Sequence, residues 1–181
     1  MNSKERVLKT IMHQEPDRVP VGEWGIDHDH VSRIIGHHTY WRNRKDETIA
    51  LWEGRRDEVV ESQKNDCVEL VEKLDYDIIT VGLVPPKGYI HPDPPKKIGD
   101  GLWQDSKGTI YKYAPSNDSI MRISNPPPAK ESIDEKDIEK AFEKIEKMDD
   151  SVFELVDYIG NKYGDEKVIV FRGIDIYGTL M

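Results

Sequence analysis

The chain has 181 residues, 34% of them charged, and a formal net charge of −9. This acidic balance excludes a surface built to neutralise phosphates, so we expect no nucleic acid among its partners. The single cysteine excludes an intramolecular disulfide, and no apolar run reaches the ~18 residues of a membrane span, so the sequence predicts a cytoplasmic protein.

The first part of the chain is mostly helical in its pattern. Apolar residues three and four apart predict an amphipathic helix that starts near Ser3 and ends before Pro16. A short extended segment, residues 19–21, would be the first strand of a sheet. Residues 46–74 predict a long helical stretch in which Gly54 marks a kink or a break.

Two apolar runs predict buried strands. Residues 78–81 follow the long helical stretch, and residues 167–171 follow a second predicted helix at 151–163. Continuous apolar runs flanked by helices are typical of parallel strands covered on both faces, so the pattern predicts an α/β layer. In such sheets the chemistry gathers where strands end, which is at residues 80–84 and 171–175.

The segment between these strands predicts an insertion. A proline-rich loop precedes residues 101–113, which alternate as a β-hairpin should around a turn at 105–108. We expect this hairpin insertion, at about residues 100–114, to lie over one rim of the sheet without joining it. Residues 132–148 predict a charged, solvated helix.

The order of these parts resembles the N-terminal part of the uroporphyrinogen decarboxylase superfamily. The motifs that carry the resemblance are SKERVLKTIMHQEPDRVPV, LDYDIITVGLVPP, a D-G-x-W…D-x-x-G-T hairpin, and a helix followed by VIVF. The resemblance implies an α/β fold, the N-terminal portion of a (β/α)8 TIM-type barrel with an inserted β-hairpin. It also implies that residues 1–181 are a single partial domain, because such barrels take ~250 residues.

Two departures from the family pattern bear on the activity. Residues 22–29 contain no arginine where the decarboxylase has arginines for its substrate's carboxylates, and Gly82 stands where it has an aspartate. The resemblance therefore implies a corrinoid or thiol methyltransferase-like enzyme when full length. Its zinc and corrinoid would be held outside this chain, in which we expect no cofactor and no metal site.

Two alternatives remain. The first is a uroporphyrinogen decarboxylase of tetrapyrrole (haem) biosynthesis, whose carboxylate ligands would include Arg33, Arg42 and Arg44. The second is a non-catalytic half-barrel module that completes a barrel with another chain. The partners implied are a small-molecule substrate or a corrinoid protein, and a second half-barrel chain or another copy of this one.

Four residues are candidate substrate ligands, while the catalytic residues stay unassigned. The sequence DHDH at 27–30 would place His28 and His30 on one side of an extended segment, where they could hold Zn²⁺ or Fe²⁺ or face a cavity as acid and base. The alternative is a polar loop beside an active-site mouth. Arg172 and Asp175 follow the second strand and would sit at the rim, as substrate ligands or as a structural salt bridge.

Overall fold

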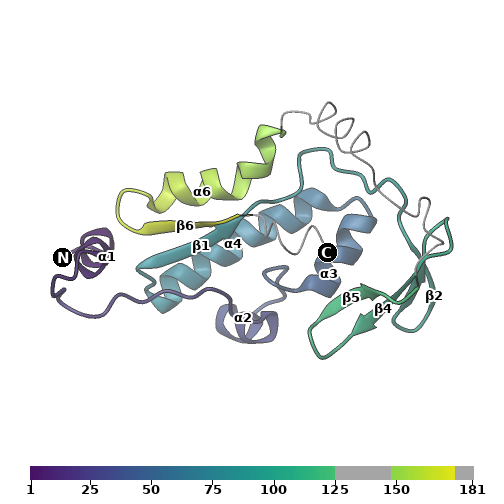
Figure 1. Cartoon of the computed structure of the whole chain (residues 1–181), viewed down its shortest axis with the longest axis horizontal. Helices are drawn as coiled ribbons and strands as arrows, with labels where there is room; N and C mark the ends of the chain where they lie inside the picture. Colours follow the sequence, from purple (N-terminus) through teal and green to yellow (C-terminus); the bar gives the residue numbers. More distant parts are fainter. Residues whose placement is uncertain (125–147, 174–181) are drawn as a thin grey trace, which may run out of the picture.

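The computed structural model describes residues 1–124 and 148–173, which form a mixed α/β structure (Figure 1). The helices are α1 (Ser3–Ile11), α2 (His28–Ile35), α3 (Arg44–Trp52), α4 (Arg56–Leu74) and α6 (Glu154–Tyr163), with a 3-10 turn η1 (Asp150–Phe153). The strands are β1 (Ile78–Gly82), β2 (Lys96–Gly99), β3 (Leu102–Gln104), β4 (Ile110–Ala114), β5 (Ser119–Arg122) and β6 (Val168–Arg172). None of the helices in these ranges has the apolar length needed to cross a membrane.

The two predicted apolar runs form a parallel pair. β1 and β6 pair from Ile78↔Val168 to Gly82↔Arg172, so both strands end at the same edge of the sheet. The prediction of two parallel strands is confirmed. Burial alternates along β1, and within the described residues α4 and α6 cover only one face, so coverage of both faces is not observed.

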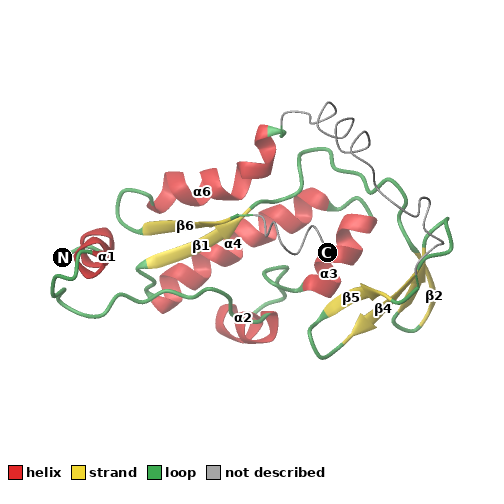
Figure 2. Ribbon diagram, in the orientation of Figure 1, coloured by secondary structure: helices red, strands yellow, loops and turns green. Residues whose placement is uncertain are grey.

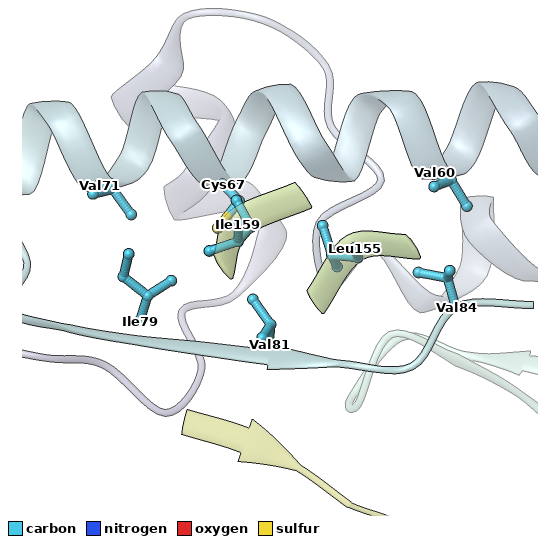
Figure 3. Close-up of a cluster of buried hydrophobic side chains, with 8 residues drawn as sticks. All are labelled: Val60, Cys67, Val71, Ile79, Val81, Val84, Leu155 and Ile159. Atoms are coloured by element: carbon cyan, nitrogen blue, oxygen red, sulfur yellow. The ribbon is translucent and has the colours of Figure 1, made fainter. Parts of the chain in front are cut away.

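The covered face holds the main core. Ile79 and Val81 of β1 point toward α4, which contributes Val60, Cys67 and Val71, while α6 contributes Leu155 and Ile159 (Figure 3). Ile159 is fully buried within this cluster. The apolar side chains whose spacing predicted these helices also stabilise their packing on the sheet, because burying each one contributes ~1.5–3 kcal/mol.

The predicted first strand, residues 19–21, does not form; only one isolated β-bridge is found beside it among the described residues. The carbonyl of Val21 accepts hydrogen bonds from the amides of Asp77 and Ile78, and Gly22 forms one isolated parallel bridge to Ile78. Pro20 lacks the N–H that a longer ladder needs. The prediction of a strand at residues 19–21 was therefore wrong, although the segment does run beside β1.

The long helical stretch is broken at Gly54, as the sequence predicted. α3 ends at Trp52 and α4 begins at Arg56, and between them Gly54 has φ +73°, a left-handed conformation that glycine adopts without strain. The helix starts earlier than expected, because the side chain of Asn43 accepts a hydrogen bond from the amide of Asp46 and caps α3.

The insertion forms a separate antiparallel sheet with strand order β2-β3-β4-β5 (Figure 2). The predicted hairpin is its β3–β4 pair, and one further strand flanks it on each side. Trp52 of α3 packs edge-on against Trp103 and Tyr111 of this sheet, with ring centroids 5.9 and 5.7 Å apart. The predicted helix at 132–148 lies almost entirely outside the described residues. Neither sheet closes into a barrel within these ranges.

A buried ion-pair network fastens the N-terminal helix to the start of β1. Asp77 is completely buried, and its carboxylate accepts hydrogen bonds from Arg6, Arg18 and the amide of Val21. Arg6 also reaches Asp17, with 2.6 Å between Nε and Oδ1. The network links three segments, α1, residues 17–21 and the start of β1, so its loss would release α1 from the sheet.

Two carboxylates of this network have lowered pKa values. Burial acts to raise the pKa of Asp77, but hydrogen bonds from Ser3, the Val21 amide and the two arginines outweigh it and lower the pKa to about 2. The hydrogen bond from Arg6 likewise lowers the pKa of Asp17 to about 2. Both groups therefore stay ionised in the folded chain at pH values where free aspartates take up protons.

These shifts predict acid destabilisation. An unfolded aspartate with a pKa near 3.9 binds protons that the folded network does not, so the free energy of unfolding should fall between about pH 4 and pH 2 and be steadier above about pH 5. Urea unfolding across this pH range measures the loss. The Asp77→Asn variant, which has no carboxyl there, should show a shallower decline, and an equally steep decline in that variant would contradict the assignment.

Candidate functional site

A cavity of about 190 Å³ lies at the carboxyl end of β1. Its walls come from β1, the middle of α4, residues 23–26 and 41–42, and the start of α3, and Leu155 of α6 and Arg172 of β6 complete them. The parallel pairing explains this meeting, because it brings the ends of β1 and β6 to one edge of the sheet. The sequence predicted a site at this edge.

Three arginines line the cavity. Arg42 follows Trp41 with φ +57°, a strained conformation for a residue that bears a Cβ, and the second side chain is Arg44 at the start of α3. The third is Arg172 at the end of β6.

Gly25 leaves room for the guanidinium group of Arg42. A Cβ at Gly25 would clash with the guanidinium of Arg42, and a Cβ at Gly82 would lie 3.8 Å from Nε of Arg172. This is an ordinary van der Waals distance, so the packing of Arg172 does not require a glycine at position 82. The position that the family resemblance assigns to an aspartate lies here against a cation from the neighbouring strand.

Arg42 is incompletely paired. Its Nη2 lies 3.6 Å from Oδ1 of Asp27, a largely exposed carboxylate, and its Nε is buried without a hydrogen-bond partner among the described residues. An unsatisfied buried donor costs ~1–3 kcal/mol. A ligand oxygen is the partner that would remove this cost.

Glu47, in the first turn of α3, contributes a half-buried carboxyl group to the cavity wall. Burial raises the pKa of Glu47, whereas a hydrogen bond from Nε2 of Gln63, at 3.2 Å, and the charges of Arg172 and Arg44 act in the opposite direction. A carboxyl group whose pKa is raised by burial in a cleft is typical of an acid or base catalyst.

The cavity is locally basic in an acidic protein. Three arginines outnumber the two glutamates of its lining, Glu23 and Glu47, although the whole chain carries a net charge of −9. Guanidinium groups bind carboxylates through paired N–H donors. The arrangement therefore suits an anionic ligand that is small enough for the cavity.

Cys67 also lines the cavity but is chemically quiet there. It lies on α4 and is 2% exposed, and burial raises the pKa of its thiol to about 12. A thiol of this kind stays protonated at neutral pH and is a poor nucleophile or metal ligand. Cys67 is therefore a small buried residue of α4 in the main core.

The two histidine candidates do not line the cavity. α2 begins at His28, so residues two apart point to opposite sides of a helix, and the predicted extended geometry was wrong. His28 Nε2 lies 3.4 Å from Oδ2 of Asp118 in the antiparallel sheet, whereas His30 is 62% exposed beside Asp29. The helix is stabilised by its apolar side, because Val31 and Ile35 are buried against Leu70 of α4.

The two candidates at the strand end have different outcomes. Arg172 lies at the end of β6 and lines the cavity, which is where the sequence placed it. Asp175 lies outside the described residues. Arg33, offered in the alternative prediction, is 77% exposed on α2, while its companions Arg42 and Arg44 line the cavity. Glu47 was missed, because a glutamate in the first turn of a helix ordinarily faces solvent.

The chain matches no family model, no curated protein and no solved structure. The resemblance to the uroporphyrinogen decarboxylase superfamily thus rests on the sequence motifs alone. The shape and charge of the cavity are the observations that bear most directly on function.

Proposed function

We propose that the cavity binds a small molecule through its carboxylate groups, as part of an enzyme of the uroporphyrinogen decarboxylase superfamily. The observation that carries the proposal is the set of three arginines, Arg42, Arg44 and Arg172, around one cavity at the end of the parallel strands. The unpaired Nε of Arg42 supports it further, since a carboxylate oxygen can accept from that donor.

The arginines favour a decarboxylase over a corrinoid or thiol methyltransferase. A decarboxylase needs cations that hold carboxylates, and the segment 22–29 supplies none, but Arg42, Arg44 and Arg172 offer them from other elements. A corrinoid or thiol methyltransferase makes no such demand. The cavity of about 190 Å³ is below the ~300–1,000 Å³ usual for whole drug-sized ligands, so it suits a small acid or one acidic arm of a larger ring.

Glu47 has the properties that such a reaction requires of an acid. In a decarboxylation the bond between the carboxylate carbon and the substrate breaks, CO2 leaves, and the electron pair stays on the substrate carbon, which then takes a proton. Because burial raises the pKa of Glu47, this carboxyl can hold that proton nearer neutral pH than an exposed glutamate can. We assign it as the proton donor in the proposed reaction.

Binding of simple acids tests the proposal. Calorimetric titration of the full chain with succinate, citrate and uroporphyrin should show binding that succinamide does not match. The variants R172Q and R42Q should each weaken it about tenfold or more, since a lost charge-assisted hydrogen bond costs ~1.5–3 kcal/mol.

The matched control is R33Q, which removes an arginine that is 77% exposed on α2 and should leave the affinity unchanged. Circular dichroism would verify that all three variants fold. Equal losses in R33Q and R172Q, or no binding of any of the acids, would overturn the proposal.

A non-catalytic half-barrel module is the second candidate. It is favoured by the apolar stripe of α1, since Leu8, Ile11 and Met12 are 48%, 66% and 68% exposed although the sequence pattern predicted them on a buried face. A partner that covers this stripe would account for it. The same titrations separate the two candidates, because a module without a site of its own would bind none of the acids.

A further inference from the structure

A second group of polar side chains lies away from the cavity lining. His37, in the loop after α2, meets Asp66 and Glu69, which lie three residues apart on one face of α4. One ligand atom from each of these residues lies within 4.8 Å of the other two. The cluster joins two parts of the chain that are far apart in sequence.

The ring of His37 is oriented by the backbone. Its Nδ1 lies 2.9 Å from the carbonyl oxygen of His38, and because a carbonyl can only accept, Nδ1 must carry a hydrogen. Nε2 lies 3.0 Å from Oε1 of Glu69, and because a carboxylate also accepts, this contact uses a hydrogen on Nε2 that a bound metal ion would replace. Metal-binding histidines have this arrangement, in which the second nitrogen donates to a carbonyl or carboxylate.

Asp66 is a buried carboxylate without a cationic partner. It is 1% exposed, and its Oδ2 accepts from two neutral hydroxyl groups, Thr39 Oγ1 at 2.5 Å and Ser62 Oγ at 2.7 Å. Across residues 1–124 and 148–173, no lysine, arginine or histidine nitrogen lies within 4.0 Å of it. A buried carboxylate is stabilised by a positive charge beside it, which either the imidazolium form of His37 or a bound cation can supply.

The remaining neighbour of the cluster is a lysine on its outer side. Lys73 Nζ lies 3.8 Å from Oε2 of Glu69, and it donates to the carbonyls of Ile34 and Ile35 at the end of α2. It therefore faces the other oxygen of Glu69 and leaves Oε1 directed at His37.

We propose that His37, Asp66 and Glu69 bind a divalent metal ion, with Zn²⁺ the best match. One imidazole nitrogen and two carboxylate oxygens are a donor set that Zn²⁺ accepts, with a water molecule as fourth ligand. Ligand atoms around a tetrahedral zinc lie ~3.3 Å apart, so the site must contract slightly. His37 and Glu69 can provide this movement, because their side chains are 48% and 37% exposed. The ion would fasten the segment between α2 and α3 to α4.

Zinc titration of the metal-free full chain tests the proposal. Elemental analysis after dialysis should give one Zn²⁺ per chain, and the ion should raise the melting temperature, because it binds the folded state only. The variants H37Q and E69Q should lose tenfold or more in affinity. Both alter partly exposed side chains, so they should fold as the parent chain does.

Two neighbouring variants are the controls. H38Q changes the adjacent exposed histidine, which faces Asp46, and E72Q changes an exposed carboxylate farther along α4. Both should keep the affinity of the parent chain. Co²⁺ offers an independent readout, since its visible absorption bands should appear with the parent chain and be absent with H37Q. Absence of stoichiometric binding, or equal losses in the control variants, would overturn the proposal.

Discussion

The Asp77→Asn variant should lose about 3 kcal/mol or more of unfolding free energy in urea denaturation. Asp77 is completely buried and accepts hydrogen bonds from Arg6 and Arg18, so its replacement leaves two guanidinium groups without their shared anion. Removing one partner of a buried ion pair typically costs 3–5 kcal/mol, and we expect the lower end of this range because Arg6 keeps its pair with Asp17. Arg6, only 7% exposed, cannot escape to solvent without releasing α1.

Asp75→Asn is the matched control for this variant. Asp75 is 79% exposed, and its φ of +48° is a conformation that asparagine tolerates well. Its contact with Arg18 is a longer surface ion pair of 3.4 Å, so the loss should stay below about 0.5 kcal/mol. If the two variants were equally stable, the Asp77 network would not hold α1 on the sheet.

Ile159→Ala should destabilise the chain by about 3 kcal/mol. Ile159 is 0% exposed and lies between α4 and β1, in contact with the cluster that contains Cys67, Val71 and Ile79 (Figure 3). Truncating a buried isoleucine removes its transfer free energy and leaves a cavity, which together cost ~2–5 kcal/mol. The slope of the urea transition should stay unchanged, since the same surface is exposed on unfolding.

Asn161→Ala, two residues along α6, separates core packing from helix propensity. Asn161 is exposed, and alanine is the better helix former, so this variant should be neutral or slightly stabilised. A loss below about 1 kcal/mol for Ile159→Ala would show that α6 is not packed against the core as described.

The parallel sheet was predictable because its signals are local. The continuous apolar runs at 78–81 and 168–171 predict strands, and Gly54 predicts the break between α3 and α4. The burial expected of the second run is not observed among the described residues, where β6 is half-buried and Phe171 is exposed. The outer strands of the insertion were harder to foresee. β2 contains two lysines and a glycine within four residues, so it has no apolar alternation, and its pairing with β3 supplies the order that its own sequence lacks.

The site was predictable only in part, for a tertiary reason. Arg172 follows a strand, and the rule that chemistry gathers at strand ends is sufficient to locate it. Arg42 and Glu47 reach the same cavity from an irregular segment and from a helix start, and neither pattern indicates which way a side chain points. His37 and Glu69 are 32 positions apart, so no sequence spacing reveals their contact.

The antiparallel sheet enters and leaves the rest of the chain at almost one point. The amide of Val84 donates to the carbonyl of Val152 at 3.0 Å, so the two ends of the intervening stretch lie side by side. An insertion or deletion of the antiparallel sheet between these two ends would therefore leave β1, α6 and the register of β6 in place. Trp52 packs on Trp103 and Tyr111, so it would become an exposed aromatic side chain in a protein that lacks the antiparallel sheet. Relatives without the antiparallel sheet should carry a polar residue at position 52.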